Sequence, residues 1–85
     1  MYYNSVSDDK SSKMLAQSIK RLRKQNKFSQ EKLARLADIS YNTIIKIETG
    51  KANNPTFETL SKLADVFRVS MDELTGRNNK KNKKL

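Results

Sequence analysis

The chain has 85 residues, which is the length of one small domain, and it contains neither cysteine nor histidine. These absences exclude a disulfide framework, a thiolate or imidazole zinc site, a cysteine nucleophile and a Ser-His-Asp triad, so we expect a protein that is not an enzyme and has no cofactor. The formal net charge of +9 attracts polyanions, and nucleic acid is therefore the first partner to consider.

The positive charge is concentrated in the first two thirds of the chain. Residues 13–51 hold ten Lys and Arg against three acidic residues, a net charge of +7. Residues 52–76 carry a net charge of −2, and residues 77–85 hold five cations and no acid. We therefore expect the polyanion-binding face within residues 13–51.

Both ends of the chain lack apolar periodicity. Polar, charge-biased stretches of this kind do not recover their ordering entropy by burial. We expect a flexible N-terminal segment at residues 1–12, a folded domain at 13–76 and a basic disordered tail at 77–85. No run approaches 18 consecutive apolar residues, and the first residues lack the basic and apolar regions of a signal peptide, so we expect a cytoplasmic protein without a membrane partner.

The first two predicted helices follow from apolar residues at helical spacing. Residues 13–26 form an amphipathic helix with its apolar face at Leu15, Ile19 and Leu22, and with Lys20 and Lys24 on the opposite, solvated face together with the following Lys27. A second, short helix begins after Ser29, a good N-cap, and its apolar stripe is Leu33, Ala34 and Ala37.

A tight turn and a third helix come next. Asp38 occupies a position that favours a left-handed backbone, and Ser40 is able to cap the following helix. Ile44 and Ile47 mark the buried side of a helix over residues 41–49, and Gly50 supplies its C-terminal stop. The polar side chains of this helix are thereby left facing outward.

Two further helices complete the predicted domain. Thr56 caps a helix with the longest apolar stripe of the chain, formed by Phe57, Leu60, Leu63, Ala64 and Phe67. Ser70 and Glu73 form a capping box for a last turn of helix, in which Leu74 packs inward before Gly76. No stretch alternates like a strand, so the predicted class is all-α.

Two short helices joined by a tight turn within a basic bundle form a helix-turn-helix arrangement. The particular residues resemble the phage-repressor type, the Xre/Cro family, at Ser29-Gln30-Glu31-Lys32-Leu33-Ala34, Ile39-Ser40, Thr43-Ile44, Ile47-Glu48, Gly50, Asn54-Pro55-Thr56, Leu60, Leu63-Ala64, Val69-Ser70 and Asp72-Glu73-Leu74. The resemblance covers about residues 15–76. It implies a five-helix, lambda-repressor-like bundle that binds operator DNA as a homodimer and regulates transcription, most often as a repressor.

The resemblance also assigns roles to individual residues by position. It implies that base edges are contacted by Tyr41, Asn42 and Lys46, and we add Ile45, an apolar residue on that face, as a contact for a thymine methyl. It implies that the DNA backbone is contacted by Gln30, Ser40, Thr43, Lys51, Asn53, Asn54 and Thr56. Arg23 and Glu48 match an ion pair that bridges the first and third helices in some repressors.

Several functions remain open at this point. The leading hypothesis is a standalone repressor or a restriction-modification controller, and the nearest alternative is an antitoxin with a toxin partner that regulates its own operon. A protein-interaction adaptor with the same fold is a more remote alternative. We expect the dimer contact on the apolar face of the last helix, around Val69, Met71 and Leu74.

Overall fold

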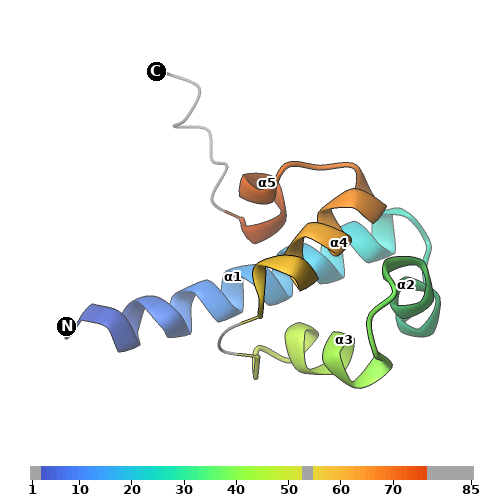
Figure 1. The fold of residues 1–85 in the computed structure, drawn as a ribbon. Coiled ribbons are helices and arrows are strands. Elements are labelled where there is room, and N and C mark those ends of the chain that lie inside the picture. The colour runs from blue at the N-terminus through green and yellow to red at the C-terminus, as the bar shows by residue number, and fades with distance from the viewer. Residues whose placement is uncertain (1–2, 53–54, 77–85) are drawn as a thin grey trace, which may run out of the picture.

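Five α-helices make up the fold in the computed structural model, which describes residues 3–52 and 55–76, with side chains from Ser12 onward. In chain order they are α1 (Tyr3–Gln25), α2 (Gln30–Ala37), α3 (Tyr41–Glu48), α4 (Phe57–Phe67) and α5 (Met71–Thr75) (Figure 1). Within the described ranges all regular secondary structure is helical, which confirms the predicted all-α class and the five-helix arrangement.

The first helix is longer than predicted. It begins at Tyr3 instead of Lys13, so residues 3–12 are helical where we expected a flexible segment. Ser12 is buried, and its hydroxyl donates a hydrogen bond to the carbonyl oxygen of Ala52 at 3.4 Å, so the folded domain includes this residue. Although α1 has 23 residues, neither it nor another described helix is apolar enough to cross a membrane.

The predicted caps place the starts of the four shorter helices. The hydroxyls of Ser29, Ser40, Thr56 and Ser70 each accept a hydrogen bond from the backbone N–H three residues further on. At α5 the side chain of Glu73 also accepts from the backbone N–H of Ser70, which completes the predicted capping box. Each cap satisfies one of the unpaired amides of a first helical turn, and this is why such short helices begin at defined residues.

Left-handed residues other than glycine follow three of the helices. Asp38 has φ 58° and ψ 50°, as its place in the turn predicts, and its N–H bonds back to carbonyls of α2. Lys27 and Arg68 also have positive φ, at 59° and 58°, after α1 and α4. Neither of these was predicted, because Lys and Arg carry no preference for this conformation.

The core lies where the inner faces of all five helices meet. α1 packs against α3 and α5, α2 against α3 and α4, and α4 against α5 (Figure 1). Six large side chains are fully buried: Ile19, Leu33, Ile44, Ile47, Leu63 and Leu74. The aromatic rings of Phe28 and Phe67 stack at the edge of this core with their centroids 6.4 Å apart.

Phe57 is not part of the core, in contrast to the prediction from its spacing. Its side chain is 74% exposed, whereas Leu63, Ala64 and Phe67 on the same stripe are buried. Phe57 is the first residue of α4, and the next stripe position, Leu60, is itself only half-buried. The first turn of α4 therefore extends past the packed region, which helical periodicity does not reveal.

The two ends of the α4 stripe predict different stability losses. Phe67→Ala should lower the free energy of unfolding by about 3 to 5 kcal/mol, because a buried aromatic side chain and its stacking on Phe28 are lost. Phe57→Ala should lower it by less than about 1 kcal/mol, as for other exposed substitutions. Urea unfolding followed by circular dichroism measures both values. Equal losses would contradict the finding that Phe67 is buried and Phe57 is exposed.

Candidate nucleic-acid interface

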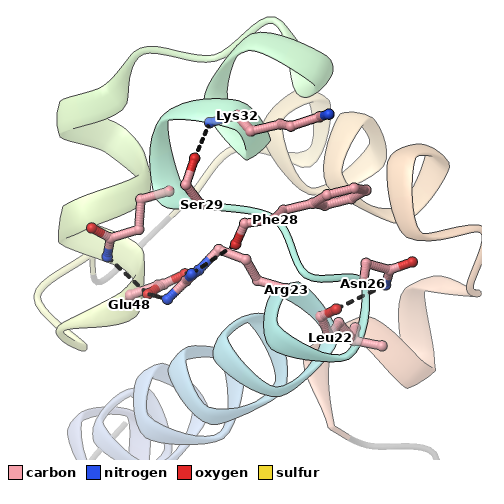
Figure 2. A network of polar contacts seen from close by, with 8 residues as sticks. Leu22, Arg23, Asn26, Phe28, Ser29, Lys32 and Glu48 are labelled. Atoms are coloured by element: carbon pink, nitrogen blue, oxygen red, sulfur yellow. Dashed lines mark hydrogen bonds and ion pairs between the residues drawn. The ribbon is translucent and has the colours of Figure 1, made fainter.

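A buried ion pair joins α1 to the C-terminal end of α3. Arg23 donates from Nε to Oε2 of Glu48 at 2.6 Å and from Nη2 to Oε1 at 3.1 Å (Figure 2). Glu48 is 5% exposed, although it is the last residue of an eight-residue helix. The two parallel bonds have the fork geometry in which Arg binds a carboxylate most strongly.

Two further segments are tied to this pair. Arg23 also donates from Nη1 to the carbonyl oxygen of Phe28 at 2.9 Å, and Gln30 donates from Nε2 to Oε1 of Glu48 at 2.9 Å. The Glu48 carboxylate therefore accepts three hydrogen bonds, and the network links α1, the segment before α2, α2 itself and α3. We call these four residues, Arg23, Phe28, Gln30 and Glu48, the Glu48 network.

A second polar contact holds the turn between α2 and α3. The ammonium group of Lys62, on α4, donates to the carbonyl oxygen of Asp38 at 3.3 Å and lies 3.8 Å from Oδ2 of the same residue. Lys62 also pairs with Glu58 at 3.5 Å, one helical turn earlier. A cation placed at the C-terminal end of α2 is favoured by the helix dipole.

α3 divides into a buried side and an outward side. Ile44 and Ile47 are fully buried, whereas Tyr41, Asn42 and Lys46 are exposed. Ile45 is half-buried instead of fully outward, so its side chain lies at the border between the two sides. The helix thus presents a phenol, an amide and an ammonium group on one surface above an apolar base.

Several residues predicted to contact the DNA backbone are engaged within the protein. Ser40 and Thr43 share a hydrogen bond between their hydroxyls at 2.8 Å, and the Thr56 hydroxyl donates to that of Thr59 at 3.0 Å. Lys51 is exposed just after α3. Asn53 and Asn54, which were also predicted to contact backbone, lie outside the described residues.

The electrostatics around α3 favour an anion. Its first turn contains no acidic residue, so no side-chain charge within that turn offsets the positive end of its dipole. Exposed Lys46 and Lys51 follow near the other end of the helix. Backbone amides at a helix start and exposed Lys side chains are both groups that bind phosphate oxygens in DNA complexes, and α3 has one kind at each end.

Two contacts of this site were missed from the sequence. The i,i+4 spacing of Glu58 and Lys62 is a local signal for their pair, although that pair was not predicted, whereas the bond from Lys62 to the turn joins residues 24 positions apart and has no local signal. The same holds for the bond between Gln30 and Glu48, which are 18 positions apart. Such contacts depend on how the helices pack.

The expected dimer contact on α5 is partly wrong. Leu74 has no exposed surface, because it belongs to the core of the single chain. Val69 and Met71 are half-buried and pack against the same core. The apolar residues of this five-residue helix pack into the core of their own domain, so Leu74 is not available to a second copy of the chain.

These features define a helix-turn-helix protein. Two short helices are joined by a left-handed turn, and the second helix buries its apolar side while exposing polar side chains. The profile of the Helix-turn-helix family matches residues 19–74, from the middle of α1 to Leu74 in α5. The chain belongs to this family, in its Xre-like branch.

Relatives with the same domain are named as regulators. The chain is 37% identical over 57 residues to an HTH-type transcriptional regulator of Rickettsia prowazekii (strain Madrid E), an alignment that covers 64% of this chain and 62% of that protein. It is 40% identical over 58 residues to the HTH-type transcriptional regulator RghRB of Bacillus subtilis (strain 168), covering 68% and 42%. The chain thus spans about two fifths to three fifths of these relatives. No solved structure matches it.

The burial of the Glu48 network predicts a large effect of breaking it. Glu48→Ala should lower the free energy of unfolding by about 3 to 5 kcal/mol, because the guanidinium of Arg23 is left without its counterion in a mostly buried position. The matched control is Glu58→Ala, whose pair with Lys62 is exposed and should contribute only about 0 to 1 kcal/mol. Thermal unfolding of both variants decides, and a Glu48→Ala loss no larger than the control would refute the prediction.

Proposed function

We propose that this protein is a sequence-specific DNA-binding regulator of transcription, which binds duplex DNA as a homodimer and represses its target. α3 enters the major groove in this proposal. The observation that carries it is the division of α3 into a fully buried apolar side and an exposed side bearing Tyr41, Asn42 and Lys46. A regulator of this kind needs no chemistry from the protein, only a helix held firmly in a defined orientation.

The exposed side chains of α3 supply the chemistry of base recognition. An Asn amide pairs with the N6 and N7 groups of adenine, and a Lys ammonium donates to O6 and N7 of guanine. Asn42 and Lys46 would fill these roles, and Tyr41 adds a hydroxyl and an aromatic face next to them. Ile45, at the border of the surface, offers an apolar contact for a thymine methyl group.

Contacts to the DNA backbone would fix the position of α3 in the groove. Gln30 uses one N–H of its side-chain amide for Glu48, and its other N–H remains for a phosphate oxygen. The remaining residues proposed for this role lie at helix starts or in the segment after α3: Ser40, Thr43, Lys51, Asn53, Asn54 and Thr56. Such contacts position a protein on DNA without reading its sequence.

Selection of bound duplexes from a random pool tests the proposal directly. A sequence-specific regulator should enrich one motif, whereas an adaptor of the same fold should enrich none. A reporter placed behind the selected motif then measures the direction of regulation, and we expect lower expression when the protein is present. Recovery of random sequences only would overturn the proposed function.

Substitutions on α3 should separate base reading from general affinity. Asn42→Ala and Lys46→Ala should each weaken binding to the selected duplex by about 1 to 3 kcal/mol, because each loses its contact to one base pair. Their binding to a random duplex of the same length should change little. Titration by fluorescence anisotropy at one fixed salt concentration measures both, and equal losses on the two duplexes would mean that α3 does not read bases.

The selected motif should also reveal the homodimer. One eight-residue helix reads few base pairs, so two copies are needed for selectivity. We expect two inverted half-sites whose centres are roughly 34 to 36 Å apart, one turn of the double helix. Footprinting with a duplex that carries one half-site should show much weaker protection, and full protection of a single isolated half-site would contradict the dimer.

A further inference from the structure

A row of exposed cations runs along the outer side of α1. It consists of Lys13, Lys20, Arg21 and Lys24, which we call the α1 stripe. At 100° per residue, these four positions fall within an arc of roughly 100°, on the side of the helix opposite Leu15, Ile19 and Leu22. Because those three residues are buried, the α1 stripe points away from the core.

Among the side chains that the structure describes, those from Ser12 onward, no ion pair neutralises the α1 stripe. α1 contains no acidic residue from Ser12 to Gln25. The ion pairs found among the described residues join Arg23 to Glu48 and Lys62 to Asp38 and Glu58, and none of them includes a stripe residue. Four like charges on one helical face repel one another and are stabilised by a polyanion.

The α1 stripe faces a different direction from the α3 surface. α1 meets the α3 side of the domain through Ser12, which bonds to Ala52, and through Arg23, which bonds to Glu48. These positions lie roughly 110 to 130° around the helix from the centre of the stripe. On the other flank of α1, Met14 and Ser18 lie beside Gly76 at the end of α5. Lys13, Lys20 and Lys24 therefore lie between the two contact sides, whereas Arg21 borders the α5 side, where it lines a hollow with Met14, Ser18 and Gly76.

The composition of the α1 stripe favours nucleic acid over a membrane or a protein. A helix that lies on a membrane needs bulky apolar residues, and the exposed large apolar side chains of the described chain are Leu36, Tyr41 and Phe57, none of them on α1. Protein interfaces depend on buried aromatic anchors and are depleted in Lys at their centre. A sugar-phosphate backbone requires only accessible cations, because binding is driven by the release of counterions.

The length of the α1 stripe also suits a DNA backbone. Lys13 and Lys24 are eleven positions apart, which corresponds to about 16 Å along the helix. Duplex DNA carries one phosphate charge per roughly 1.7 Å of its axis, so each stripe cation can reach its own phosphate.

We propose that the α1 stripe binds the backbone of a second DNA duplex, without regard to sequence, while α3 occupies the groove of the first. The protein then bridges two DNA segments. This inference rests on the proposed function of α3, but it concerns a separate surface and an additional activity.

A two-duplex capture experiment tests the bridge. A biotinylated duplex carrying the selected motif is fixed on beads, loaded with the full-length protein and washed, and a fluorescent 30-base-pair duplex of random sequence is then added. The wild-type protein should retain the fluorescent duplex at about 50 mM salt and release it as salt is raised. Protein remaining on the beads is measured separately. Beads that retain no protein would show that the protein does not bind the selected motif, and this result would overturn both proposals.

A charge-matched pair of variants isolates the α1 stripe. Lys20→Gln with Lys24→Gln removes two stripe cations, and Arg35→Gln with Arg68→Gln removes two exposed cations elsewhere. The stripe variant should load the beads within about twofold of its matched control, yet retain about tenfold less fluorescent duplex, with a salt slope lower by about 1.8 because two phosphate contacts are lost.

Three results would overturn the bridge while leaving the α3 proposal intact. The first is no retention of the second duplex by loaded wild-type protein. The second is an equal loss of retention in both double variants, which would assign the effect to net charge. The third is competition by polyglutamate as effective as that by DNA at equal charge, which would indicate an acidic protein as the partner of the stripe.

Discussion

The buried carboxylate of Glu48 is the constraint on which the position of α3 depends. A charge withdrawn from water is tolerated only when its oxygens are fully hydrogen-bonded and a counterion is close. Here the partners come from α1, through Arg23, and from the first residue of α2, through Gln30. Moving α3 relative to either helix would break bonds to a buried charge, so the orientation of a very short helix is determined by electrostatics as well as by packing.

α3 separates the side chains that stabilise the fold from those that we propose bind DNA. Eight residues are too few for an isolated helix to persist in water, so the stability of α3 comes from its neighbours. Ile44, Ile47 and Glu48 make those contacts from the buried side. The exposed positions carry little of the folding free energy, and their side chains can change with small effect on the fold. Under the proposed function, specificity for different DNA sequences can therefore vary on a constant framework.

Local signals predicted most of the fold, and features that depend on packing escaped them. The starts of α2 to α5 followed from hydroxyl caps, which act within three residues. Residues 3–12 show no apolar periodicity, so the extension of α1 to Tyr3 could not be predicted from the sequence. The exposure of Phe57 depends on where the core ends, which the spacing of apolar residues does not show. The Arg23–Glu48 pair joins residues 25 positions apart, so resemblance to a family, and not spacing, indicated it. The hydrogen bond from Gln30 to Glu48 became visible only in the packed arrangement of the helices.

The left-handed residues after the helices leave the domain below its attainable stability. Lys27, Asp38 and Arg68 each hold a backbone conformation that costs an L-residue with a side chain roughly 1 kcal/mol, a strain that glycine does not have. Lys27 and Arg68 end helices outside the turn that carries α3, and both side chains are exposed. Replacing Lys27 and Arg68 by glycine could therefore give a more heat-resistant domain without altering the surface of α3.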